Sequence, residues 1–87
     1  MVKLERQLKA VANRRRLAIL AFLKKNKFAS VGEIADAIKL SFKATSKHLL
    51  ILANMEILEK DQENLQMFYR VSKSQASSVV RHLISIL

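Results

Sequence analysis

The chain contains no cysteine, no proline and a single glycine among its 87 residues. The absence of cysteine excludes disulfides and thiolate metal sites. With so little proline and glycine, we expect helices joined by short turns and no flexible linker. The longest uninterrupted apolar run, residues 17–23, is too short to span a bilayer, and the charged N-terminus lacks the apolar core of a signal peptide. We therefore expect one cytoplasmic domain over residues 1–87, without a membrane partner.

Acidic residues are also few, and this shortage decides the expected partner. Sixteen Lys and Arg residues face seven Asp and Glu residues, a formal net charge of +9. The excess is concentrated in residues 1–28, where Glu5 is the only acid beside nine basic residues. Such an excess favours a polyanionic partner, and nucleic acid is a commoner one than a membrane surface. The alternative is a lysine-rich protein whose charge serves solubility alone.

The most informative segment is a predicted helix over residues 42–54. Ser41 is suited to the N-cap position and Asn54 to the C-cap. At 100° per residue, two opposed faces appear. The apolar face contains Phe42, Thr45, Leu49 and Leu52, and the polar face contains Lys43, Ser46 and Lys47. A helix anchored by one face and basic on the other suits a DNA major groove, although a solvated surface helix has the same pattern.

The other segments predict further helices and a hairpin. Periodicity and two S-x-x-E/Q capping boxes, at Ser30–Glu33 and Ser72–Gln75, place the helix starts. The expected order is helix 2–12, helix 14–26 capped by Asn13, an extended link at 28–29, a two-turn helix after Ser30, helix 42–54, a hairpin turning at 61–64, and helix 73–87. This order predicts a mainly α fold with a β-hairpin wing, a winged helix-turn-helix.

Three blocks in this order resemble the ArsR-type family of small winged-helix transcriptional repressors. They are LKAVANRRRLAILAFL, then SVGEIADAIKLSFKATSKHLLIL with the S-x-H-L signature at Ser46, His48 and Leu49, and ILEKDQENLQMFYRV with the closing Tyr69-Arg70. The resemblance runs from Leu8 to Val71. It implies a homodimeric repressor that reads a palindromic operator in double-stranded DNA with helix 42–54.

The chain departs from the metal-sensing members of that family. Their C-x-C motif is replaced by Phe28-Ala29-Ser30-Val31, and the last helix offers His82 without an acid. No nucleophile–base pair and no Gly-rich phosphate loop is visible. We therefore expect no metal, no cofactor and no catalysis, and the sequence names no effector.

Candidate DNA contacts come from three places in the sequence. They are Ser41, Lys43, Ala44, Ser46, Lys47 and His48 on the reading helix, Arg14, Arg15 and Arg16 at the start of the second helix, and Gln62 and Asn64 in the wing. Arg16 has the alternative of a structural salt bridge, and His48 that of packing. Leu50, on the outward face, is suited either to a thymine methyl or to covering a neighbouring helix. The acids Asp61 and Glu63 weaken the case for wing contacts to phosphate.

The terminal helices carry apolar stripes that suggest a subunit interface. The stripe of the first helix contains Leu4, Leu8 and Val11, and that of the last contains Val79, Val80, Leu83, Ile84 and Leu87. The family resemblance implies a symmetric homodimer through these two helices. Two functions of other classes stay open from the residues alone: a non-specific architectural protein that coats DNA, and a winged helix that binds another protein.

Overall fold

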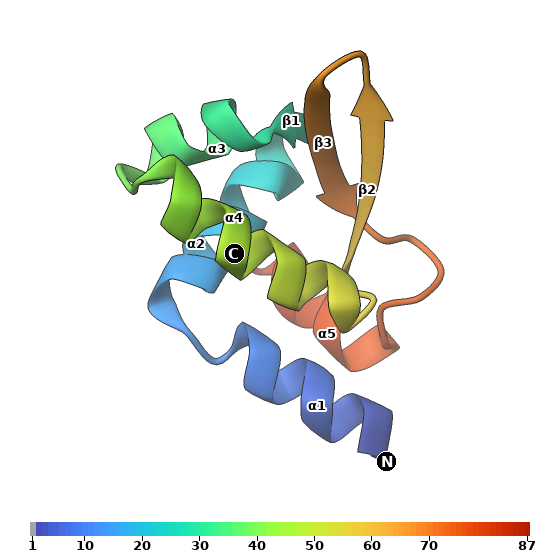
Figure 1. Cartoon of the computed structure of the whole chain (residues 1–87). Coiled ribbons are helices and arrows are strands. Elements are labelled where there is room, and N and C mark those ends of the chain that lie inside the picture. Colours follow the sequence, from blue (N-terminus) through green and yellow to red (C-terminus); the bar gives the residue numbers. More distant parts are fainter. Residues whose placement is uncertain (1) are drawn as a thin grey trace.

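The computed structural model describes residues 2–87, which form five helices and three strands (Figure 1). The elements are α1 (Val2–Val11), α2 (Arg14–Asn26), β1 (Phe28–Ser30), α3 (Val31–Ile38), α4 (Phe42–Asn54), β2 (Leu58–Glu63), β3 (Gln66–Val71) and α5 (Ser78–Ser85). The predicted winged helix-turn-helix order is confirmed, with α3 and α4 as the helix pair and β2–β3 as the wing.

The wing is longer than predicted and has a third strand. Residues 61–63 continue β2, so the turn consists of Asn64 and Leu65, and Asn64 adopts a positive φ of 57°. The predicted extended link is β1, which pairs antiparallel with β3 and places Ala29 opposite Tyr69. The rings of Phe28 and Phe68 lie 5.6 Å apart across this pair. The sheet order β1-β3-β2 therefore ties the wing to the junction between α2 and α3.

Side-chain caps start three of the helices as predicted. The Asn13 carboxamide accepts the amides of Arg15 and Arg16, and Ser41 accepts that of Ala44 at 3.1 Å. Ser30 and Glu33 form the full reciprocal capping box. The end of α4 differs from the prediction, because Glu56 and not Asn54 takes the left-handed conformation, at a φ of 63°.

The last helix begins later than predicted, at Ser78, with Ser77 as its N-cap. Ser72 does accept the amide of Gln75, but its hydroxyl donates to Glu59 of β2 at 3.1 Å, and its own amide is bonded to the carbonyl of Ile57. These bonds hold Ser72 at the end of the sheet. Residues 72–77 consequently form a connecting loop, and the expected helix over 73–87 is shortened at both ends, since α5 also stops at Ser85.

The core lies between α1, α2, α3, α4, the base of the wing and α5 (Figure 1). Its largest fully buried apolar side chains are Ile19, Leu20, Leu23, Ile34, Leu49, Leu52, Ile57 and Val80. Helix α2 contributes three of them, as expected from its nearly continuous apolar sequence.

Gln7 is buried in this core although its sequence context is that of a surface residue. Its amide nitrogen donates to the carbonyl of Met55 at 2.8 Å and to that of Gln75 at 3.3 Å. Its side-chain oxygen accepts the amide of Ser77 at 3.0 Å. One side chain thus connects α1, the end of α4 and the loop before α5.

Thr45 occupies the core face of α4, and its hydroxyl has no hydrogen-bond partner among residues 2–87. A buried hydroxyl without a partner loses its hydration without compensation. We expect Thr45→Val to raise the free energy of unfolding by about 1 kcal/mol, measured by urea denaturation at fixed protein concentration. Thr45→Ala is the comparison: it also removes the hydroxyl but leaves a void, so it should be less stable than Thr45→Val. A loss of stability in Thr45→Val would mean that the hydroxyl is bonded.

Candidate nucleic-acid interface

The outward face of α4 is basic and lies opposite a fully buried stripe. Thr45, Leu49 and Leu52 are completely buried, whereas Lys43 and Lys47 are exposed on the far side of the helix. Ser41 caps this helix, so the first turn of α4 is well defined. Lys43 and Lys47 lie one and five residues after its first residue, Phe42. The predicted separation of a core face from a basic face is therefore present in the structure.

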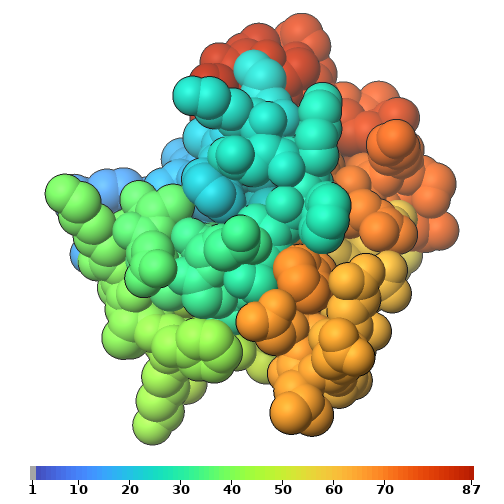
Figure 2. Space-filling model, turned by 90° about the horizontal axis from the view of Figure 1, so that it is seen from above, coloured from blue at the N-terminus to red at the C-terminus, as the bar shows by residue number. Residues whose placement is uncertain are grey.

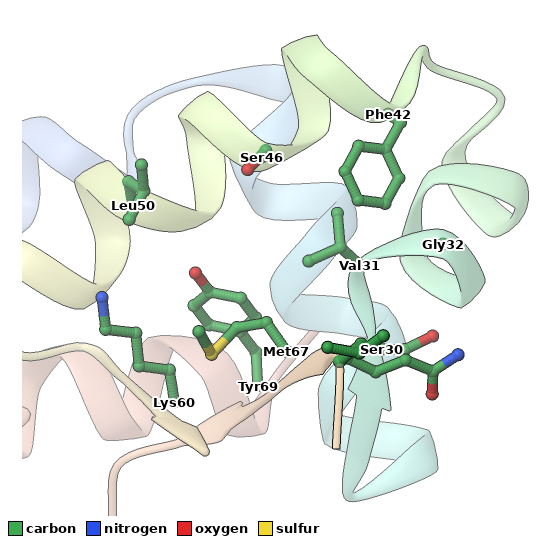
Figure 3. A pocket seen from close by; sticks show the side chains of 11 residues that line it. Ser30, Val31, Gly32, Phe42, Ser46, Leu50, Lys60, Met67 and Tyr69 are labelled. Atoms are coloured by element: carbon green, nitrogen blue, oxygen red, sulfur yellow. The ribbon is translucent and has the colours of Figure 1, made fainter. Parts of the chain in front are cut away.

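We predicted that Phe42 lies on the core face of α4, and this prediction is wrong. Its side chain is 62% exposed, because the first turn of α4 extends beyond the elements that bury the rest of the core stripe. The ring instead lies beside Val31 at the edge of a surface pocket (Figure 3).

This pocket separates α4 from the wing and has a volume of about 490 Å³. Phe42, Ser46 and Leu50 line it from α4, and Lys60 and Met67 from the wing (Figure 3). Ser46 is half-buried here, so it lies beside the Lys43–Lys47 stripe and not on it. Leu50 faces the pocket as well, which disfavours the alternative that it covers a neighbouring helix.

Tyr69 closes the floor of the same pocket. The residue is buried, and its hydroxyl points up between α4 and the wing (Figure 3). Burial raises the pKa of this hydroxyl above its ordinary value, so it remains protonated and able to donate a hydrogen bond at neutral pH. The notch between the start of α4 and the wing is also visible from above (Figure 2).

The Arg16 guanidinium bonds to His48 and to the protein backbone. The Arg16 Nε–H donates to His48 Nδ1 at 3.2 Å, and Nη1 donates to the carbonyl of Ala10 at 3.1 Å. Burial lowers the pKa of His48, and the positive charges of Arg16 and Arg15 lower it further. A neutral imidazole that accepts from a guanidinium is a structural pair joining α2 to α4. This pairing favours the structural alternative for Arg16 and the packing alternative for His48.

Arg14 and Arg15 remain exposed at the start of α2. Arg15 Nη1 donates to the carbonyl of Ile38, the last residue of α3, at 3.3 Å. The next residue, Lys39, turns the chain toward α4 in a left-handed conformation with φ 56° and is also exposed. We did not single out Lys39 from the sequence, although a basic residue between two short-linked helices was the available signal.

Part of the acidic charge of the wing is neutralised by ion pairs within the wing. Arg70 of β3 forms ion pairs with Glu59 at 3.0 Å and with Asp61 at 3.6 Å. At the tip, Gln62 and Asn64 are exposed, and the Gln62 amide donates to the Asn64 carbonyl at 3.4 Å. Pairing of Asp61 on the strand leaves the tip less acidic than its sequence suggests.

The predicted interface residues divide into two groups. Val11, Val80 and Ile84 belong to the core of a single subunit and correct our expectation that they lie at an interface, because α1 and α5 turn these side chains inward. Leu4, Leu8 and Leu83 are half-buried, and Val79 and Leu87 are exposed. Ile86, at 71% exposure, and Val2 are further exposed apolar residues on the same two segments that we did not predict.

Two further properties of residues 2–87 bear on metal binding and on membrane insertion. Residues 2–87 contain no group of three or more His, Cys, Asp or Glu side chains placed to hold a metal ion. Within the same range, no helix has the length and apolar character needed to cross a membrane.

Residues 13–60 match the family described as bacterial regulatory protein, arsR family. The chain is 37% identical over 76 residues to the transcriptional activator HlyU of Vibrio cholerae, a match covering 87% of this chain and 69% of that protein. The solved structure of HlyU from Vibrio cholerae superimposes with a TM-score of 0.83 at 35% identity, over 98% of this chain and 87% of that one.

Two further solved structures are similar. One is a fragment from Mycobacterium bovis described as a homodimeric winged helix-turn-helix DNA-binding domain, with a TM-score of 0.81 at 30% identity, covering 97% of this chain and 73% of that one. The other is the transcriptional repressor PagR of Bacillus anthracis, with a TM-score of 0.76 at 26% identity, covering 92% of this chain and 86% of that one.

Proposed function

The chain belongs to the arsR family of bacterial regulatory proteins, DNA-binding regulators of transcription, and from this membership we propose that it represses transcription as a homodimer that occupies a palindromic operator. The observation that carries the proposal is the outward face of α4. Its exposed Lys43 and Lys47 lie opposite a fully buried stripe, with the wing alongside. A helix fixed in this way presents its basic side chains without distorting the core.

Each part of the surface has a distinct role in this proposal. Lys43 and Lys47 contact base edges or phosphates in the major groove, and Ser41 and Ala44 approach the backbone at the helix N-terminus. Arg14, Arg15 and Lys39 add phosphate contacts from the start of α2 and from the turn, and Gln62 and Asn64 reach the adjacent groove from the wing. Leu50 and Ser46, beside the pocket, are placed for a thymine methyl and a polar base edge.

Dimerisation through α1 and α5 is the second part of the proposal. Val79 and Ile86 are exposed on α5 and its end, and Leu83 is only half-buried between them. The similar domain from Mycobacterium bovis is described as homodimeric. A two-fold axis beside these helices gives two copies of α4, which then read half-sites about one helical turn apart, roughly 34–36 Å.

The decisive experiment is selection from random duplexes at two salt concentrations. We expect enrichment of an inverted repeat whose half-site centres are separated by about 10 base pairs. Binding with a steep salt dependence but no enriched sequence would indicate the architectural alternative. Failure to bind any duplex at low salt would contradict DNA binding by this chain and favour a protein-interaction module.

Val79→Glu tests the interface without touching the core. Val79 is 49% exposed in the subunit, so the charge should leave the fold intact but become costly where two copies meet. We expect a monomer by sedimentation and an operator affinity lowered by roughly 100-fold, because the two half-sites are no longer bound together. Ser78→Glu, one residue earlier and also exposed, adds the same charge and should remain dimeric. Wild type that sediments as a monomer at tens of micromolar would refute the dimer.

A further inference from the structure

A second and larger cavity lies between the end of α2, the end of β3 and α5. Its volume is about 770 Å³, which is within the range of small-molecule sites. Figure 2 shows the segments that border it: the red α5 and the orange residues after β3 lie next to the cyan and teal residues at the end of α2 and in β1. The cavity is separate from the pocket that adjoins α4.

Five basic side chains surround this cavity, and its lining contains no Asp or Glu. They are Lys24, Lys27, Arg70, Lys73 and Arg81. Arg70 is compensated by its ion pairs with Glu59 and Asp61. Lys24 and Arg81 bond only to neutral backbone carbonyls, those of Ser85 at 2.7 Å and Lys73 at 3.3 Å. The positive charges therefore face one another across the cavity, and a bound anion would relieve their repulsion.

The floor of the cavity is apolar. Leu23 and Ile84 are almost completely buried there, Val71 is half-buried, and Phe28 forms part of the wall. DNA phosphates would use the basic rim but not this floor. A rim of cations above an apolar floor instead fits a ligand that has an anionic head and an apolar body.

The cavity stays open in the proposed dimer. At 100° per residue, Arg81, Ile84 and Ser85 lie on the cavity side of α5, and Val79, Leu83 and Ile86 lie on the opposite side. The proposed partner subunit would therefore cover the second side and leave the first accessible to solvent.

From these observations we propose that the cavity binds a small organic carboxylate, with its head against the lysines of the rim and its hydrocarbon body on Leu23 and Ile84. Lys27 and Lys73 are the best placed to hold the head, since both are exposed at the rim and neither is in an ion pair among residues 2–87. This site does not depend on DNA binding or on dimerisation, and its test contains no DNA.

The test uses the full chain and three probes. Octanoate has both a carboxylate and a hydrocarbon chain, acetate has the carboxylate with almost no chain, and octanol has the chain without the charge. Octanoate should bind by calorimetry at least tenfold more tightly than either acetate or octanol, because only octanoate engages both rim and floor. In two-dimensional amide NMR spectra, octanoate should shift the signals of residues 23–28, 70–73 and 81–85 and leave those of α4 unchanged.

Two variants and one control locate the head group. Lys27→Gly and Lys73→Ala should each weaken octanoate binding by roughly fivefold or more. Lys27→Gly also relieves a positive φ of 68°, so loss of folding would not explain its effect. Lys25→Ala removes the same charge from α2 outside the cavity and should bind like wild type. Equal affinity for acetate and octanoate, shifts confined to another surface, absence of binding at millimolar octanoate, or equal weakening in Lys25→Ala would each overturn the site.

Discussion

Replacing Lys43 and Lys47 together with Ala is expected to lower operator affinity by roughly 100-fold while leaving the melting temperature almost unchanged. Each side chain is exposed on the face of α4 opposite the core, so neither contributes packing. A specific base or charged phosphate contact is worth about 1–3 kcal/mol in such interfaces. The dependence of affinity on salt should also become shallower by about two counterions for each subunit, if both lysines contact phosphate.

Fluorescence anisotropy on the selected operator at several salt concentrations measures both effects. The matched control is Lys9→Ala with Lys25→Ala, which removes the same charge from exposed positions on α1 and α2. This control should lose little affinity, because long-range attraction alone is screened over roughly 8–10 Å. Wild-type affinity in the α4 double variant, or an equal loss in the control, would refute α4 as the reading helix.

Gln7→Leu is expected to destabilise the fold by roughly 3 kcal/mol. The substitution leaves the carbonyls of Met55 and Gln75 and the amide of Ser77 without their shared partner, the buried Gln7 side chain. A buried polar group without a partner costs about 1–3 kcal/mol. Because the surrounding structure relaxes in part, the total for the three backbone groups stays below the sum of their full penalties. For a domain of this size, the corresponding fall in melting temperature is about 12–24 °C.

Thermal and urea unfolding at one fixed protein concentration provide the measurement, since a dimer has a concentration-dependent stability. Arg6→Leu is the control, because Arg6 is the exposed neighbour of Gln7 on α1 and its replacement breaks no buried bond. The control should stay within about 0.5 kcal/mol of wild type. If Gln7→Leu is as stable as Arg6→Leu, then the Gln7 bonds do not hold the three segments together.

Local signals in the sequence predicted most helix starts. Asn13, Ser30 and Ser41 each act on amides two or three residues away, so a sequence motif contains the whole interaction. Ser72 and Ser77 show the limit of this reasoning. Both accept a nearby amide, but the contact of Ser72 with Glu59, which is 13 residues away in sequence, decides that the helix starts after Ser77.

The outline of the candidate site was also predicted from local sequence patterns. The errors in that prediction come from contacts between segments that are far apart in the sequence. Periodicity separates the two faces of α4 but does not show how far the neighbouring elements extend, so Phe42 was assigned to the core. The bond between Arg16 and His48 joins residues 32 positions apart, and no spacing rule reveals it. Gln7 resembles a surface residue of an amphipathic helix until α4 and the loop before α5 are placed around it.

The order of the sheet also limits how this protein can aggregate. With β3 in the centre, the two free edges are β1, which has three residues, and β2, which has six. An unpaired edge strand is a template for intermolecular β-sheet growth unless it is short or charged. The longer edge carries Glu59, Lys60, Asp61 and Glu63 in five consecutive positions, and stacking a second copy there would bring like charges together. Uncontrolled strand-to-strand association is thereby disfavoured, which lets a protein with an exposed hairpin stay dispersed at the concentrations that a search along DNA requires.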